Sequence, residues 1–168
     1  VLVCHRRFGK TVCMINHLIR SALISKQKNP RFAYIAPTFK QAKSIAWDYM
    51  KQFTAKIPHT KFNETELRVD LPNGSRITLL GSENSDGLRG IYLDGCVIDE
   101  YANVNERLFP EIIRPALSDR KGYCVFIGTP QGMNNNFYEL YQHAQGAEDW
   151  FNYKAKASET KIVDNEEL

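Results

Sequence analysis

Several features that would mark a membrane, secreted or metal-binding protein are missing from this sequence of 168 residues. No apolar run approaches the roughly 20 residues that span a bilayer, and no stretch resembles a signal peptide. There is no internal repeat or low-complexity tract. The cysteines lack C-x-x-C spacing, which argues against zinc ligands and disulfides. We therefore predict reduced, small core residues at Cys4, Cys13, Cys96 and Cys124. We therefore expect one globular domain in the cytoplasm, with no membrane partner.

A strong net charge is also lacking, but the two halves of the chain carry charge of opposite sign. The formal net charge is +3, to which residues 1–84 contribute +9 and residues 85–168 contribute −6. The basic half could face phosphate, of either a nucleotide or a nucleic acid. Alternatively, its cations are solvated helix and loop positions, and both interpretations stay open for Lys26, Lys28, Arg31, Lys40, Lys43 and Lys51.

The stretch from His5 to Thr11 is the strongest single motif. It follows the short apolar run Val1–Cys4, which predicts a buried strand. It precedes apolar residues at helical spacing, namely Val12, Ile15, Leu18, Ile19, Ala22 and Leu23. Strand, loop and helix around Gly-Lys-Thr form the context of a P-loop, in which backbone N–H groups and the helix N-terminus bind a polyphosphate.

In this interpretation Lys10 reaches the β- and γ-phosphates of ATP, and the Thr11 hydroxyl holds Mg²⁺. The nucleotide-binding stretch comprises Cys4, His5, Arg6, Arg7, Phe8, Gly9, Lys10 and Thr11. Cys4 stands where the general pattern G-x-x-x-x-G-K-[ST] has its first glycine. The alternative is a Gly-Lys-Thr at a helix start without a ligand. Two arginines beside Lys10 argue against a site without a ligand, because cations crowded together favour the binding of an anion.

Strands and helices alternate after this motif. A buried strand is predicted at residues 32–36, and Thr38 then caps a helix whose apolar face comprises Ala42, Ile45, Ala46, Tyr49, Met50 and Phe53. Residues 61–80 alternate around the turn Pro72-Asn73-Gly74 and predict a hairpin or antiparallel pair. Continuous apolar strands that alternate with helices predict an α/β fold with a mainly parallel sheet covered on both faces.

A further strand, predicted over Gly95–Glu100, begins with apolar residues and ends in the adjacent carboxylates Asp99 and Glu100. The carboxyl ends of parallel strands meet at one edge of a sheet, so this pair should face the P-loop. Neighbouring strand residues point to opposite faces. Asp99 is therefore predicted to hold Mg²⁺, directly or through water, and Glu100 to be the base that polarises an attacking water. A helix cap or a surface turn is the alternative for such a pair.

The last part of the chain continues the alternation. We expect a short helix over 109–117 interrupted by Pro110 and Pro115, a strand over 123–127, a helix over 134–145 and a last strand over 150–153. Thr129, after the strand 123–127, is predicted to lie near the γ-phosphate, the alternative being a simple turn. Residues 158–168 are polar and acidic, as in a linker or the start of another domain.

Five motifs together resemble the N-terminal ATPase domain of the large terminase subunit of tailed bacteriophages, the DNA-packaging motor. In chain order they are Arg6–Thr11, Ile35–Ala42, Leu88–Ile91, Val97–Ala102 and Ile127–Pro130. The resemblance implies a P-loop fold of the additional-strand, conserved-glutamate type. It also accounts for a residue other than glycine at Cys4 and for an arginine inside the loop.

The resemblance implies further roles. Arg6 matches the arginine that contacts phosphate within its own subunit, and Arg7 is a neighbour that shares the task. Arg89 matches the proposed arginine finger that reaches a neighbouring subunit's nucleotide in a ring. Gly128–Pro130 matches the motif that couples hydrolysis to movement. From its residues alone, Arg89 could instead anchor its loop through a salt bridge, and Asp86 and Asp94 are the candidate partners.

By resemblance, residues 1–157 are an ATPase domain truncated at its N-terminus, without the adenine-contacting segment, and 158–168 lead toward an absent nuclease domain. The implied function is ATP hydrolysis coupled to translocation of double-stranded DNA in the host cytoplasm, by a ring on a portal that also engages the small terminase subunit. Nuclease activity is not expected here. The alternatives are another P-loop motor such as a helicase, and a non-catalytic prophage remnant.

Overall fold

Eight strands form a single sheet in the computed structural model, which describes residues 1–160 apart from the side chain of Asp86. The strands run in the spatial order β3-β4-β5-β2-β6-β7-β1-β8. Among these described strands, only the pairs β3–β4 and β4–β5 are antiparallel. Their bounds are β1 Leu2–Cys4, β2 Arg31–Ala36, β3 Lys61–Asn63, β4 Arg68–Asp70, β5 Arg76–Gly81, β6 Gly95–Ile98, β7 Tyr123–Gly128 and β8 Tyr153–Ala155. The predicted α/β class with a mainly parallel sheet is confirmed, as is the antiparallel addition within residues 61–80.

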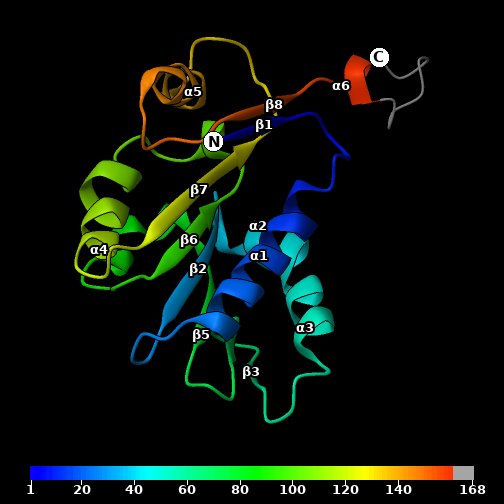
Figure 1. The fold of residues 1–168 in the computed structure, drawn as a ribbon, viewed down its shortest axis with the longest axis vertical. Helices are drawn as coiled ribbons and strands as arrows, with labels where there is room; N and C mark the ends of the chain where they lie inside the picture. The colour runs from blue at the N-terminus through cyan, green and yellow to red at the C-terminus, as the bar shows by residue number, and fades with distance from the viewer. Residues whose placement is uncertain (161–168) are drawn as a thin grey trace.

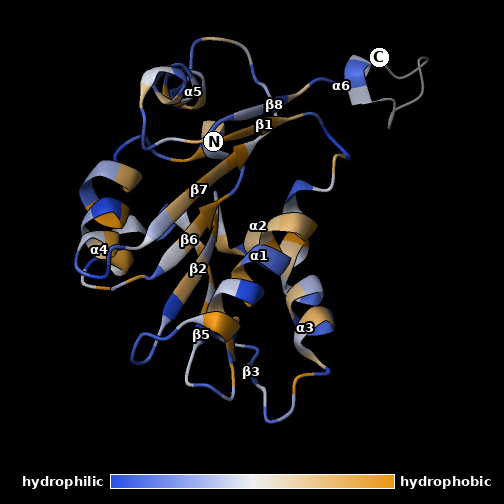
Figure 2. Cartoon of the chain, viewed as in Figure 1, coloured by the Kyte–Doolittle hydropathy of each residue, from blue (hydrophilic) through white to orange (hydrophobic). Residues whose placement is uncertain are grey.

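Helices cover both faces of this sheet (Figure 1). The first group, α1 to α3, packs on one face, and α4 and α5 lie on the other. The helical segments are α1 Lys10–Ile24, α2 Phe39–Ala42, η1 Lys43–Trp47, α3 Asp48–Thr54, η2 Ser82–Leu88, η3 Tyr101–Asn103, η4 Phe109–Ile113, α4 Arg114–Ser118, α5 Asn136–Gly146 and α6 Ala157–Thr160. Hydrophobic residues concentrate on the central strands (Figure 2). In residues 1–160, no helix combines the length and apolar character needed to cross a membrane.

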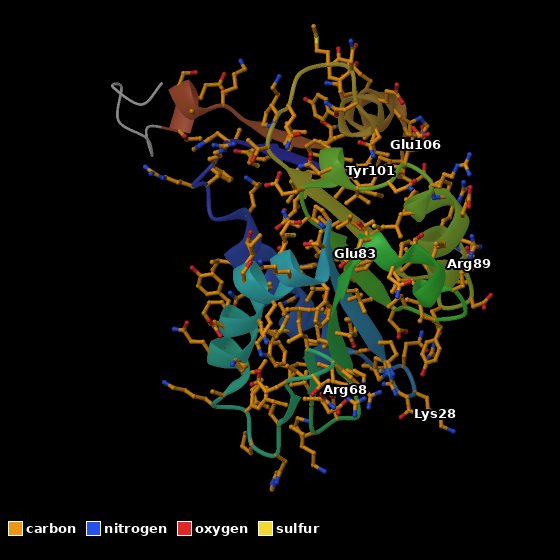
Figure 3. The ribbon with its side chains drawn as sticks, turned by 180° about the vertical axis from the view of Figure 1, so that it is seen from behind. Lys28, Arg68, Glu83, Arg89, Tyr101 and Glu106 are labelled. Carbon is orange, nitrogen blue, oxygen red and sulfur yellow. The ribbon has the colours of Figure 1, made fainter. Side chains whose placement is uncertain are left out.

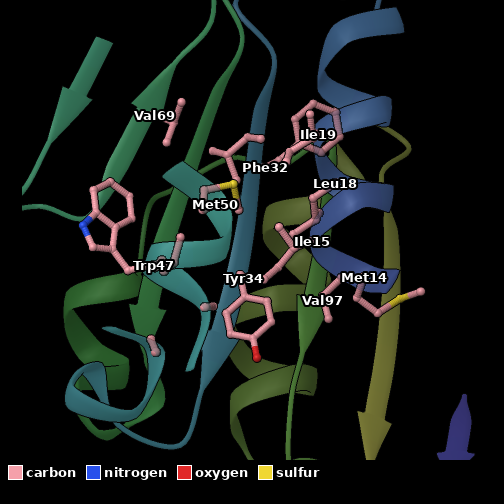
Figure 4. Close-up of a cluster of buried hydrophobic side chains, with 14 of the residues drawn as sticks. Met14, Ile15, Leu18, Ile19, Phe32, Tyr34, Trp47, Met50, Val69 and Val97 are labelled. Carbon is pink, nitrogen blue, oxygen red and sulfur yellow. The ribbon is translucent and has the colours of Figure 1, made fainter. Parts of the chain in front are cut away.

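Two apolar clusters sandwich the sheet, one on each face. In the first, Ile15 and Leu18 of α1 pack against Tyr34 of β2, and all three are fully buried (Figure 4). In the second, Phe126 of β7 meets Tyr101 edge to face at a centroid distance of 4.8 Å. Because the central strands are apolar on both faces, the sheet edge where they end is the place left for polar chemistry.

The helix after β2 differs from its prediction in which residues it buries. Ile45 and Tyr49, expected on the apolar face, are 38% and 41% exposed, whereas Trp47 is 1% exposed. The cause is the π-helical turn η1, which inserts one residue and rotates the following face. Trp47 is fixed there by its indole N–H, which donates to Glu64 Oε2 at 2.6 Å.

This rotation gives a stability prediction. Trp47→Ala should destabilise the fold by about 3–5 kcal/mol, because it empties a fully buried aromatic position. Ile45→Ala, the matched control on the same turn, should cost less than about 1 kcal/mol. Urea unfolding followed by circular dichroism measures both. Equal losses for the two variants would mean that the helix keeps the regular face predicted from its spacing.

Three other expectations need correction. Pro110 and Pro115 do not interrupt the helical backbone of residues 109–118, in which η4 passes directly into α4. Pro110 lies in the first turn, where a missing N–H is tolerated, and Pro115 follows the π-helical turn η4, where the regular α-helical hydrogen-bond spacing is already broken. The last strand begins at Tyr153, since Trp150 stacks on Phe126 at 5.8 Å instead of pairing. Cys13 is exposed and not in the core, because α1 turns the adjacent Met14 and Ile15 inward.

Candidate nucleotide-binding site

Three strand ends converge at one edge of the sheet. The order β6-β7-β1 brings the loop after β1 beside the ends of β6 and β7. A cavity of about 670 Å³ opens there. Its lining combines the predicted Arg6, Arg7, Lys10, Glu100 and Thr129 with four further residues, Gln41, Asn103, Pro130 and Gln131. The structure thus brings together five of the residues that the sequence singled out.

The loop between β1 and α1 has the backbone of a tight turn. Arg7 has a φ of 61° and Gly9 a φ of 82°, the left-handed region that glycine tolerates best. The helix α1 begins at Lys10, and no side chain caps its start. The first N–H groups of a helix have no partner within it, so they are available to an anion at this position.

Lys10 lies at the centre of the cavity's polar contacts. Its ammonium donates to the carbonyls of Cys4 at 3.1 Å and His5 at 3.0 Å, and to Thr129 Oγ1 at 3.3 Å. Together with Arg6 and Arg7 it places three cations around one cavity, in which Glu100 is the single carboxylate among the described lining residues. Such an excess of positive charge over backbone N–H groups favours a polyphosphate ligand.

Asp99 is 3% exposed and held by three donors. Its Oδ2 accepts from the Thr11 hydroxyl at 3.3 Å and from the Tyr34 hydroxyl, and its Oδ1 accepts from the Glu100 N–H at 2.8 Å. Tyr34, in the middle of an apolar run, carried no sequence signal for this role. Burial and the neighbouring Asp99 raise the pKa of Tyr34, which keeps it a hydrogen-bond donor.

The pair of Thr11 and Asp99 fits Mg²⁺. A hydroxyl and a carboxylate oxygen are hard ligands, and Mg²⁺ usually takes one or two carboxylates with the oxygens of its phosphate partner. In residues 1–160, apart from the side chain of Asp86, no cluster of three or more His, Cys, Asp or Glu residues could hold a metal alone. A metal at this site would therefore depend on a phosphate ligand for the rest of its coordination.

Glu100 differs from Asp99 in both setting and backbone. It adopts a φ of 46° just after β6, which turns its side chain into the cavity. Burial, and then the negative charge of Asp99, raise the pKa of Glu100. Its Oε1 is 3.5 Å from Thr129 Oγ1. A half-buried carboxylate with a raised pKa is suited to accept a proton from water.

Other predicted residues lie outside the cavity. Cys4 is buried, and Phe8 packs with its ring 5.3 Å from His5 and 6.4 Å from Tyr153. His5 Nε2 is 2.7 Å from the hydroxyl of Thr160 in α6. These three residues contribute to the loop through their backbone and packing.

Arg89 also lies outside the cavity. It follows η2 at the outer edge of the molecule (Figure 3), where its Nη2 is 3.7 Å from Glu111 Oε2. Asp94, one of its two suggested partners, pairs instead with Arg120 at 3.9 Å. The side chain of Asp86, the other suggested partner, lies outside the described part of the chain.

Three polar residues that line the cavity, Gln41, Asn103 and Gln131, had no role predicted from the sequence. For Gln41 a signal existed. Thr38 and Gln41 have the spacing of a capping box, which orients a glutamine side chain at a helix start. Asn103 and Gln131 follow Glu100 and Thr129 closely in the chain, and only the fold shows that their side chains reach the same space.

Comparisons with known proteins agree on one family. The model of the family described as "Terminase large subunit, T4likevirus-type, N-terminal" matches residues 3–167. The large terminase subunit of Thermus phage G20c is 29% identical over 126 residues, which cover 64% of this chain and 26% of the relative. The same figures hold for the subunit of Thermus virus P23-45. The chain thus spans about a quarter of the length of these curated relatives.

Solved structures support the fold. The large terminase ATPase domain of Thermus phage P74-26 is similar with a TM-score of 0.77 at 21% identity, covering 99% of this chain and 84% of that one. The large terminase of another thermophilic bacteriophage, in complex with ATP-gamma-S, is similar with a TM-score of 0.76 at 16% identity, covering 98% of this chain and 41% of that one. The expected fold type is therefore confirmed.

Proposed function

Because this chain belongs to the N-terminal family of T4-type large terminase subunits, we propose that it is an ATP-hydrolysing motor domain that couples hydrolysis to translocation of double-stranded DNA. The observation that carries the proposal is the single cavity shared by Lys10, Arg6, Glu100 and Thr129. It offers cations for phosphates, a carboxylate for water, and a hydroxyl that contacts both Lys10 and Glu100.

In the proposed reaction, ATP lies with its phosphates over the loop that ends at Lys10. Lys10 exchanges its carbonyl partners for the β- and γ-phosphate oxygens, and Arg6, with Arg7 beside it, stabilises negative charge on the phosphoryl group. Thr11 and Asp99 would hold Mg²⁺, which would neutralise phosphate charge. Glu100 orients a water and takes its proton as the oxygen attacks phosphorus, and ADP leaves with the bond to the γ-phosphoryl broken.

Thr129 lies between the cation and the base of this reaction. Its Oγ1 accepts from Lys10 and is within 3.5 Å of Glu100. Loss of the γ-phosphate would change both of these contacts at once. Since Thr129 follows directly on β7, we expect such a change to pass into the segment Gly128–Pro130, which is how hydrolysis would be coupled to movement.

The other parts of the motor and its partners are proposed only from membership of the family. Residues 1–157 would be the ATPase part of a longer subunit, with 158–168 leading to a nuclease domain; residues 161–168 lie outside the described part. The partners would be double-stranded DNA, further copies in a ring on a portal, and the small terminase subunit, in the host cytoplasm. A helicase and a non-catalytic remnant are less favoured, because the family match spans residues 3–167 and the cavity keeps its charged residues.

A nucleotide-binding measurement tests the proposal. The unmutated protein should bind Mg·ATP and release phosphate, and Lys10→Met should weaken ATP binding by about 10–100-fold, because it removes a charge-assisted contact to phosphate. Methionine keeps most of the aliphatic stem of Lys10. Calorimetric titration measures binding, and thermal unfolding confirms that the loop still folds. If both proteins bind ATP equally, the phosphate site is elsewhere.

A further inference from the structure

We infer that Gln41 binds the terminal phosphate of the nucleotide and so distinguishes a triphosphate from a diphosphate. The inference rests on the proposed function and adds a residue to its site. Gln41 lies in the cavity lined by Lys10, Glu100 and Thr129, although it belongs to the helix after β2 and not to the P-loop.

The position of Gln41 follows from the order of the strands. In the sheet, β2 and β7 lie on either side of β6. The loop after β2 therefore approaches the end of β6 from the side opposite to Thr129. Glu100 follows β6, so Gln41 and Thr129 flank the carboxylate that would position water. On the proposed function, a ligand atom at this point of the cavity would be the γ-phosphoryl group or its attacking water.

The carboxamide of Gln41 is oriented by a capping box. Its Oε1 accepts from the Thr38 N–H at 3.2 Å and lies 3.2 Å from the Thr38 hydroxyl, while the Gln41 N–H donates to that hydroxyl at 3.1 Å. With the oxygen committed to the cap, the amide nitrogen is the atom left to serve a ligand. In residues 1–160 it donates to no acceptor. An amide donor beside three cations suits a phosphate oxygen.

The helix start that carries Gln41 is itself fixed. The Phe39 N–H donates to Glu83 Oε1 at 2.7 Å, and the Ser82 hydroxyl donates to the Pro37 carbonyl at 3.0 Å. Gly81 packs so closely that an added Cβ would clash with the backbone nitrogen of Phe39. In Figure 3, Glu83 lies near the α2 ribbon. Gln41 is thus held before a ligand binds, which lowers the entropic cost of its contact.

The test compares two nucleotides. Gln41→Ala should weaken binding of Mg·ATP-gamma-S by about tenfold, the value of one charge-assisted hydrogen bond, and change ADP affinity by less than about twofold. Gln41→Glu keeps an oxygen for the cap but brings an anion to the phosphate, so its loss for ATP-gamma-S should be larger. Gln52→Glu, on the exposed side of α3, is the charge-matched control and should change neither affinity. Calorimetric titration measures all of them.

The outcomes separate this inference from the proposed function. If the unmutated protein binds neither nucleotide, the proposed function fails and the role of Gln41 fails with it. If the unmutated protein binds both nucleotides but the Gln41 variants lose both equally, or lose neither, the role of Gln41 alone is overturned. A loss in Gln41→Ala that Gln41→Glu restores would assign the effect to the helix cap and would also overturn it.

Discussion

Glu100→Gln should abolish most ATP turnover and leave nucleotide binding intact. Glutamine keeps the shape of the side chain but cannot take a proton from water, a loss typically of about 10²–10⁴-fold in rate. The contacts proposed to bind phosphate come from Lys10, Arg6, Arg7, Gln41 and the loop backbone, and none of them involves Glu100. Phosphate release and calorimetric binding of ATP, measured on the same preparation, check both halves of the expectation.

The free energy of unfolding of Glu100→Gln supplies a control, because the direction of its change can be predicted. Burial and the charge of Asp99 raise the pKa of Glu100, so its ionised form costs folding free energy at pH 7. That cost fades as the pH falls through the raised pKa. A neutral glutamine removes it, and the variant should unfold at the same urea concentration as the parent or a higher one at pH 7. Undiminished turnover in a folded variant would exclude Glu100 as the base.

The sequence was informative where one local pattern decided the structure. Apolar runs placed β2 and β7 within a residue of their bounds, and the Gly-Lys-Thr motif located the start of α1. The strand predicted over Gly95–Glu100 was too long, because β6 ends at Ile98 and Glu100 adopts a left-handed backbone with a φ of 46°. The side chains of Lys10, Glu100 and Thr129 could be predicted to meet, because parallel strands bring their carboxyl ends to one edge.

Other features depend on contacts between distant segments, which no local pattern encodes. Trp47, the last residue of the π-helical turn, is held by a hydrogen bond to Glu64, 17 residues further on. Tyr34 looked like any core residue of a buried strand, and only the fold brings its hydroxyl to Asp99. Gln41 likewise needed the strand order β2–β6 before its capping box could be related to the cavity. The deviations from the predicted structure thus concentrate where tertiary packing overrides spacing.

The setting of Arg89 favours a guanidinium that reaches outward from the molecule. Its side chain is 56% exposed, and Glu111, one of its partners, is 46% exposed at a distance of 3.7 Å. This exposed ion pair with Glu111 is worth only about 0–1 kcal/mol. Gly90 follows at a φ of 83° with open space around it, whereas Ser82 and Glu83 fix the other end of the loop. These features suit a guanidinium that swings outward from a fixed stem.

We therefore expect Arg89 to act on the nucleotide of a neighbouring subunit, where an arginine finger contributes about 10³–10⁵-fold in rate. Arg89→Ala and Glu100→Gln subunits, each nearly inactive alone, should recover activity when mixed under conditions of assembly. Random mixing should restore roughly a quarter of the parental rate, since half the sites keep Glu100 and half their neighbours keep Arg89. Arg107→Ala, which removes the other arginine near Glu111, should hydrolyse ATP normally. Co-assembly without recovery would instead assign Arg89 to anchoring its loop, because a finger supplied by a neighbour must complement.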